Sequence, residues 1–78
     1  MLTVSDAAAI YYAGRIRACL EGQPEGASFG DLCSWCRPAP RWPAFFRAVR
    51  RLEADQVVVV QRDDDRKIRW VERGRRWT

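Results

Sequence analysis

The chain has 78 residues, of which 47% are apolar and 12% aromatic, and its formal net charge is +4. A chain of this size buries roughly 60% of its unfolded surface, which leaves room for one compact core and little for a catalytic cleft. The apolar content is too high for a disordered chain, and no apolar run approaches the roughly 18 residues of a membrane span. The N-terminus lacks a basic segment followed by a long apolar stretch, so we expect a cytoplasmic protein without a signal peptide.

The charge is distributed unevenly along the chain. Residues 1–36 hold two basic and four acidic residues, whereas residues 37–78 hold twelve basic and six acidic residues, a net charge of +6. Thirteen of the 14 basic residues are arginines, whose guanidinium group can bind a phosphate or a guanine through two hydrogen bonds. The basic half therefore indicates a polyanionic partner.

Two helices are predicted in the first half. The first ends near Gly22, because glycine allows a left-handed exit and Pro24 cannot continue a helix. Its apolar stripe has helical spacing and consists of Ala9, Tyr12, Ala13, Ile16, Cys19 and Leu20. The second begins at Ser28, where Ser28 and Asp31 resemble a capping box with Asp in place of the usual Glu. Its apolar face consists of Phe29, Leu32, Cys33 and Cys36.

A third helix is predicted over residues 42–54 and is strongly amphipathic. One face carries Trp42, Phe45, Phe46, Val49 and Leu52, at helical spacing. The opposite face carries Ala44, Arg47, Arg50, Arg51 and Ala54. Three prolines within residues 38–43 separate this helix from the second, and Pro43 or Pro40 suits its first turn. Trp42, Phe45 and Phe46 could form a stacking platform for single strands, but at helical spacing in a small protein we expect the aromatic face to belong to the core. We expect the arginine face to be exposed.

A β-hairpin is predicted after the third helix. Residues 57–60 are four consecutive valines, which favour a strand, and a charged turn over residues 62–66 follows. Residues 67–71 alternate polar and apolar like a half-buried strand, with Trp70 packing the hairpin onto the helices. Residues 72–78 read as a basic, flexible tail. The whole chain, 1–78, is thus one domain with a core over about residues 5–71.

This order of elements resembles the winged helix-turn-helix family, most closely over residues 46–58, where the third helix leads into the hairpin. The resemblance covers residues 5–71 and implies an α+β fold: a three-helix winged helix-turn-helix with a C-terminal two-stranded β-hairpin wing. It implies a recognition helix at 43–54 in the major groove of DNA and a wing at 57–71 on the backbone or minor groove. It also implies a short strand near Ala27 and Ser28, beside the wing.

Three features depart from the family pattern. Gln56 stands where many members have a glycine, at a cost near 1 kcal/mol if the position needs a positive φ. The connection between the second and third helices is longer and richer in proline than the usual 3–4 residues. The wing tip carries Asp63, Asp64 and Asp65, which phosphates would repel. Either the flanking basic residues make the contacts, or the wing does not touch DNA.

The candidate nucleic-acid-binding residues are the basic residues of the third helix and the hairpin: Arg41, Arg47, Arg50, Arg51, Arg62, Arg66, Lys67 and Arg69. Arg47 and Arg51 are expected to reach base edges. Arg41 and Arg50 are expected to contact phosphates, each contact steepening the salt dependence of binding. The alternative interpretation is an ordinary solvated helix face.

The cysteines do not predict a metal site. Cys33 and Cys36 form a CxxC pair and Cys19 is the third cysteine, but the chain has no histidine to complete four zinc ligands. No βαβ pattern surrounds the pair, so we interpret all three as small buried hydrophobic residues. Without histidine, a Ser/His/Asp triad is impossible, and no glycine-rich phosphate loop is present. The sequence thus predicts neither an enzyme nor a cofactor.

The sequence supports one main hypothesis and leaves two alternatives open. The main hypothesis is a small protein that binds double-stranded DNA, as a transcriptional regulator or a phage- or plasmid-type accessory factor. It would act as a homodimer, because one small module contacts few base pairs. The first alternative is a protein-binding adaptor or inhibitor on the same scaffold, using Asp63–Asp65 and exposed aromatic residues. The second is a single-strand or RNA binder that uses the basic tail and Trp77.

Overall fold

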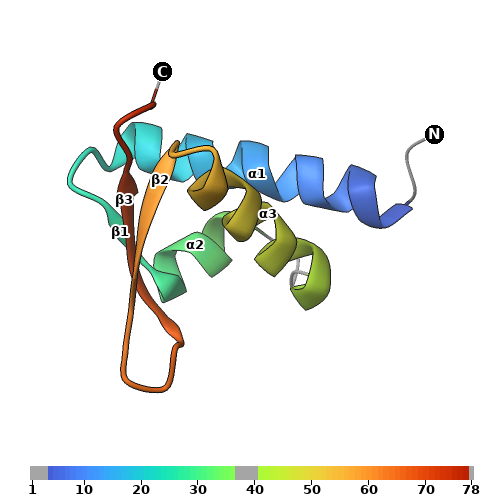
Figure 1. The fold of residues 1–78 in the computed structure, drawn as a ribbon. Coiled ribbons are helices and arrows are strands. Elements are labelled where there is room, and N and C mark those ends of the chain that lie inside the picture. The colour runs from blue at the N-terminus through green and yellow to red at the C-terminus, as the bar shows by residue number, and fades with distance from the viewer. Residues whose placement is uncertain (1–3, 37–40, 78) are drawn as a thin grey trace.

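The computed structural model describes residues 4–36 and 41–77, which form three helices and one three-stranded antiparallel sheet (Figure 1). In chain order the elements are α1 (Val4–Gly22), β1 (Ala27–Ser28), α2 (Phe29–Trp35), α3 (Trp42–Ala54), β2 (Val58–Arg62) and β3 (Ile68–Arg73). The predicted α+β class is confirmed, as are the three helices and the hairpin. Within the described residues, no helix is long and apolar enough to cross a membrane.

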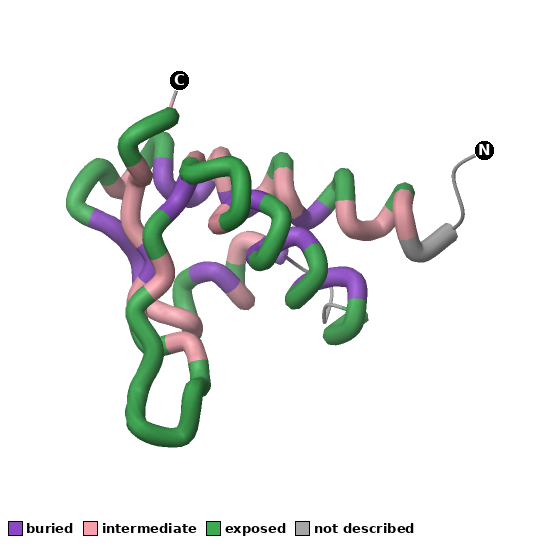
Figure 2. The backbone as a smooth tube through the Cα atoms, viewed as in Figure 1, coloured by how far each residue is buried: buried purple, intermediate pink, exposed green. Residues whose placement is uncertain are grey.

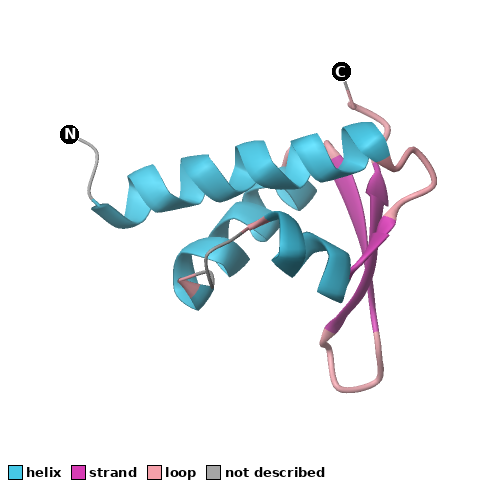
Figure 3. Ribbon diagram, turned by 180° about the vertical axis from the view of Figure 1, so that it is seen from behind, coloured by secondary structure: helices cyan, strands magenta, loops and turns pink. Residues whose placement is uncertain are grey.

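The sheet has the strand order β1-β3-β2, so the hairpin strand β3 lies in its centre. Ala27 lies opposite Val71, and Ser28 lies opposite Trp70. The predicted two-stranded hairpin is therefore part of a three-stranded sheet, with β1 at the place where a short strand was expected. Seen from behind, α1 crosses α2 and α3, and the sheet closes one end of the helices (Figure 3).

Local signals at the helix ends behave as predicted. The Asp31 backbone N–H donates to the Ser28 hydroxyl at 3.2 Å, and the Ser28 N–H donates to the Asp31 carboxylate at 3.4 Å, which completes the capping box of α2. Helix α1 ends at Gly22, and Pro43 occupies the first turn of α3. The remaining prolines of the connection, Pro38 and Pro40, lie outside the described residues.

The core lies between the helices and the inner face of the sheet (Figure 2). Its largest fully buried side chains are Phe45, Ile16, Leu20, Leu32, Val49, Val58 and Val71. The stripe predicted for α1 is buried at Tyr12, Ile16, Cys19 and Leu20. These buried residues come from all three helices and from the sheet, so the described chain has one shared core.

The predicted faces of α3 are partly wrong. Ala44, assigned to the exposed face, is buried together with Ala48, whereas Trp42 and Phe46, assigned to the core, are 44% and 37% exposed. Helix α1 packs on α3, and Ala44 and Ala48 let two helix backbones approach closely because their side chains are small. This packing turns the buried face of α3 toward the alanines and leaves two aromatic rings at the surface.

The predicted alternation in the second hairpin strand is also wrong. Gln61 pairs with Trp70 but Arg62 pairs with Ile68, so Arg69 sits in a β-bulge. The bulge allows Ile68 and Val71 to face the helices together, as their contacts with the core show. Trp70 lies on the other face of the sheet, where its ring covers Gly26: a Cβ built on Gly26 would be 2.4 Å from Trp70 Nε1. Trp70 therefore covers a loop and does not pack the hairpin onto the helices.

The C-terminal segment is not a loose tail over residues 74–77. The Gly74 N–H donates to the Val57 carbonyl at 2.8 Å, and the Arg76 N–H donates to the Gln56 carbonyl at 2.9 Å. The Trp77 ring lies under two guanidinium groups, with Arg17 at 5.3 Å and Arg73 at 5.0 Å from its centroid. These contacts extend the folded body beyond residue 71, where the predicted core ended.

Candidate nucleic-acid interface

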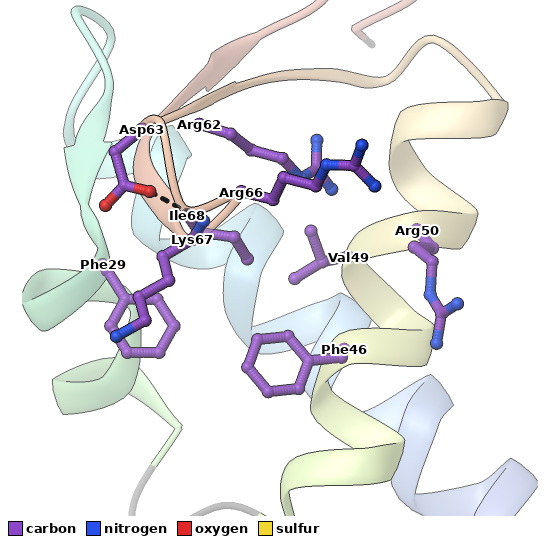
Figure 4. A pocket seen from close by; sticks show the side chains of 9 residues that line it. All are labelled: Phe29, Phe46, Val49, Arg50, Arg62, Asp63, Arg66, Lys67 and Ile68. Carbon is purple, nitrogen blue, oxygen red and sulfur yellow. Dashed lines mark hydrogen bonds between the residues drawn. The ribbon is translucent and has the colours of Figure 1, made fainter.

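A groove of about 660 Å³ runs between α3 and the β2–β3 hairpin (Figure 4). Its lining residues are Phe29, Phe46, Val49, Arg50, Arg62, Asp63, Arg66, Lys67 and Ile68. The apolar members form the floor between α2, α3 and the start of β3, and the charged members form the rim. We call this feature the α3–hairpin groove. It has the composition expected of a site for an anionic ligand with an apolar part.

Four of the predicted binding residues lie on the rim of this groove. Arg62 is held by Glu53, with two hydrogen bonds of 2.9 and 3.1 Å, and this hydrogen bonding raises the pKa of Arg62. Arg50, Arg66 and Lys67 are exposed, and no carboxylate among the described residues pairs with any of them. The groove therefore presents to a ligand three cations outside the ion pairs of the described residues, together with the carboxylate of Asp63, while Arg62 forms part of its wall.

Arg47 and Arg51, the expected base readers, lie on the other side of the exposed face of α3. Arg47 Nη1 is 3.1 Å from the Asp6 carboxylate of α1, and Arg51 Nε is 3.4 Å from Asp55. Together with residues of α1 they line a second, smaller hollow of about 450 Å³. The sequence placed all the α3 arginines on one face. The structure separates them into a hairpin side, with Arg50, and an α1 side.

The two remaining predicted residues do not line the groove. Arg41 stands at the N-terminus of α3, where its backbone N–H donates to the Tyr12 hydroxyl at 2.8 Å and its side chain is exposed. Arg69 occupies the bulge of β3 and is exposed. Both residues are close in sequence to residues that line the groove, but neither lines it.

The acidic tip of the hairpin divides into a structural residue and two exposed ones. One carboxylate oxygen of Asp63 accepts hydrogen bonds from the backbone N–H groups of Asp65 and Lys67, both at 2.9 Å. Such a side-chain turn is a standard use of aspartate, and the sequence signal was available at the first residue of the predicted turn. Asp64 and Asp65 are exposed and do not line the groove. Only these two are therefore candidates for a protein contact.

The structure forms an aromatic platform that differs from the stacking set considered in the sequence: Phe45 is buried, and Phe29 of α2 joins Trp42 and Phe46. We define the aromatic platform as Phe29, Trp42 and Phe46. Its three ring pairs are nearly parallel, with interplanar angles of 18°, 10° and 27° and centroid distances of 5.9, 6.3 and 5.8 Å. The similar distances place the three rings in a triangle and not in a column, whose outer pair would be about twice as far apart as its neighbours. The buried Phe45 ring packs roughly perpendicular to all three.

The cysteines show no sign of redox or metal chemistry. Cys19 and Cys36 are buried in the core, as predicted, and Cys33 is half-buried. Burial, with a smaller contribution from neighbouring Cys33, raises the pKa of the Cys36 thiol to about 11. The reactive thiolate is therefore scarce at neutral pH. Within the described residues, no cluster of His, Cys, Asp or Glu side chains could hold a metal ion.

No protein-family model matches the chain, and neither does any curated protein or solved structure. The functional argument therefore depends on the groove, the exposed face of α3 and the hairpin.

Proposed function

We propose that the protein binds double-stranded DNA as a winged-helix protein, with α3 in the major groove and the β2–β3 hairpin as the wing. The observation that carries the proposal is the α3–hairpin groove, which is lined by Arg50 from the helix and by Arg66 and Lys67 from the hairpin. Phosphates dominate the affinity of proteins for DNA, and arginine and lysine are the side chains that bind them.

The dimensions and exposure of α3 support this assignment. Its 13 residues make a rod about 20 Å long, and the major groove is about 12 Å wide, enough to admit a helix. Arg47, Arg50 and Arg51 are all exposed along it. The ion pairs of Arg47 and Arg51 are between exposed groups and contribute little to stability, so phosphates or bases can replace the carboxylates at small cost.

The acidic tip of the hairpin is compatible with α3 in the major groove if the tip carboxylates point away from the DNA phosphates. Asp64 and Asp65 lie outside the groove, whereas the cations that line it come from residues that follow and precede them in the hairpin. One α3 helix contacts only a few base pairs, so we propose that two copies bind adjacent half-sites. The corresponding role is that of a cytoplasmic transcriptional regulator or an accessory factor of a phage or plasmid.

The test is fluorescence anisotropy of a labelled mixed-sequence duplex at several salt concentrations. We expect the logarithm of the binding constant to fall linearly with the logarithm of salt concentration. The double variant Arg50→Ala/Arg66→Ala should reduce that slope by about 1.8, because each lost phosphate contact removes about 0.9. The double variant Arg75→Ala/Arg76→Ala is the matched control: it removes the same two charges from exposed positions outside the groove.

Flat anisotropy at low salt would contradict the proposal. The alternative function would then be favoured, namely an adaptor whose acidic hairpin binds a basic protein. Its support is that Asp64 and Asp65 at the hairpin tip are exposed. An equal loss of slope in Arg75→Ala/Arg76→Ala and in Arg50→Ala/Arg66→Ala would instead show that binding depends on total charge and not on the groove.

A further inference from the structure

We infer that the aromatic platform takes an unpaired base, so that the preferred ligand is DNA in which a duplex adjoins unpaired nucleotides. This inference rests on the proposed function and specifies its substrate. It starts from the position of the platform: Phe29 and Phe46 form part of the floor of the α3–hairpin groove, and the cations Arg50, Arg66 and Lys67 stand on its rim (Figure 4). Aromatic faces next to a basic groove are the arrangement by which proteins bind single strands.

The platform is held in place before any ligand arrives. Trp42 and Phe46 come from the first turns of α3 and Phe29 from the first residue of α2, and the fully buried Phe45 contacts all three rings. Two of the three rings nevertheless remain substantially exposed. Exposed aromatic groups that are fixed by neighbouring rings lose little freedom on binding, which favours affinity.

Paired DNA does not account for the platform. In a duplex the faces of the bases stack on each other, and a protein reaches only their edges and the phosphates. The cations of the rim can serve a duplex or a single strand equally well. Two of these nearly parallel rings are exposed at the surface, however, and only an unpaired base has a free face to stack on them. The groove volume of about 660 Å³ lies in the range of pockets that hold small organic ligands.

The experiment compares four labelled DNA ligands by anisotropy at one salt concentration. The first is a blunt duplex, the second is the same duplex with a short single-stranded overhang, and the third carries an overhang of abasic residues. The fourth is the single strand alone. We expect the natural overhang to strengthen binding by about tenfold over the blunt duplex, as stacking of a base on an aromatic ring typically does. The abasic overhang has the same phosphates but no bases, and should bind like the blunt duplex.

In the variants Phe46→Leu and Trp42→Leu, natural and abasic overhangs should bind equally; the ratio of these two affinities within one variant reports base stacking whatever the affinity for the blunt duplex. Val59→Ala, at an exposed apolar position on β2 outside the groove, should keep the ratio of the parent. Circular dichroism checks that each variant is folded. We expect both aromatic variants to fold, because Trp42 and Phe46 are exposed in the parent.

The outcomes separate this inference from the proposed function. Equal binding of blunt and overhang duplexes, or of natural and abasic overhangs, would overturn the inference and leave the duplex proposal standing; the platform would then be a candidate site for a protein ligand. Binding of the single strand alone, lost in Phe46→Leu, would support the platform and contradict the duplex proposal. No binding to any of the four ligands would overturn both.

Discussion

Among the described residues, two other than glycine adopt a left-handed backbone, and both shape the hairpin. Gln56 and Arg66 each have a φ of 63°. Gln56 ends α3: its N–H donates to the Glu53 carbonyl at 3.0 Å, and the Val57 N–H donates to the Leu52 carbonyl at 2.9 Å. This is the Schellman pattern, in which glycine is the preferred residue. The glycine expected from the winged-helix resemblance is therefore replaced by a residue that adopts the same conformation under strain.

Replacing Gln56 by glycine should stabilise the protein by roughly 0.5–1 kcal/mol. Glycine removes the steric cost of the positive φ, and the greater freedom of the unfolded chain offsets part of the gain. Urea denaturation measures the difference. Gln56→Ala is the control, because alanine keeps the Cβ and should give no gain. A glycine variant less stable than the parent would show that the Gln56 side chain contributes more than the strain costs.

The carboxylate of Asp63 is the other single group that stabilises the hairpin. It accepts two backbone hydrogen bonds within the hairpin turn. Asp63→Ala should therefore lower the free energy of unfolding by about 1 kcal/mol, the net contribution of such bonds. Asp64→Ala removes the same charge from an exposed position and should stay within about 0.5 kcal/mol of the parent. Equal losses in the two variants would mean that charge, and not the turn hydrogen bonds, sets the effect.

At the scale of elements, the last residues of the chain connect the end of α1 to the sheet. Arg73 donates from Nε and Nη2 to the Leu20 carbonyl, at 3.1 and 2.9 Å, and so caps the C-terminus of α1. Trp77 packs on this arginine and on Arg17. The sequence after β3 reads as a basic tail, but its glycine allows a close approach: a Cβ on Gly74 would be 2.4 Å from the Gln56 carbonyl oxygen.

Trp77→Ala should lower the free energy of unfolding by about 1–2 kcal/mol, through the loss of two cation–π contacts and of buried apolar area. Thermal or urea denaturation measures the loss. Arg75→Ala, also in this segment but exposed, should stay within about 0.5 kcal/mol of the parent. A Trp77→Ala variant as stable as the parent would contradict this prediction and show that the contacts of Trp77 do not contribute to the free energy of unfolding.

At the scale of the whole molecule, helices and sheet share one core. Leu32 of α2, Phe45 of α3 and Val71 of β3 are all fully buried in the same cluster. In the described part of the chain, every buried hydrophobic residue belongs to this one cluster. The hairpin tip is the part that extends away from the helices (Figure 1).

We therefore expect cooperative unfolding in a single transition. Urea unfolding followed by far-ultraviolet circular dichroism, which reports mainly helix, should coincide with unfolding followed by tryptophan fluorescence, which includes Trp70 of the sheet and Trp77. Two separated transitions would show that the hairpin and C-terminal segment open independently of the helices.

The elements of this fold were predictable because their signals are local. Capping at Ser28, the exit at Gly22 and the start of α3 at Pro43 each depend on a few neighbouring residues. The four valines and the charged turn that follows them, which contains Asp63, were sufficient to predict the hairpin. The basic side chains of the candidate interface were also identified from the sequence, because charge is a property of composition.

The sequence by itself determined which segments are helix or strand, where they end and which half of the chain is basic. Only the tertiary structure decided which side of each segment is buried. Small alanines on α3 admit α1 and so expose the aromatic platform, and a bulge at Arg69 turns Trp70 away from the helices. Arg50 and Arg47 fall on the two edges of one exposed face of α3 and line different hollows. These outcomes depend on contacts between segments that are far apart in the chain. The periodicity of one segment shows that it has an apolar and a polar face, but not which part of each face a neighbouring segment covers.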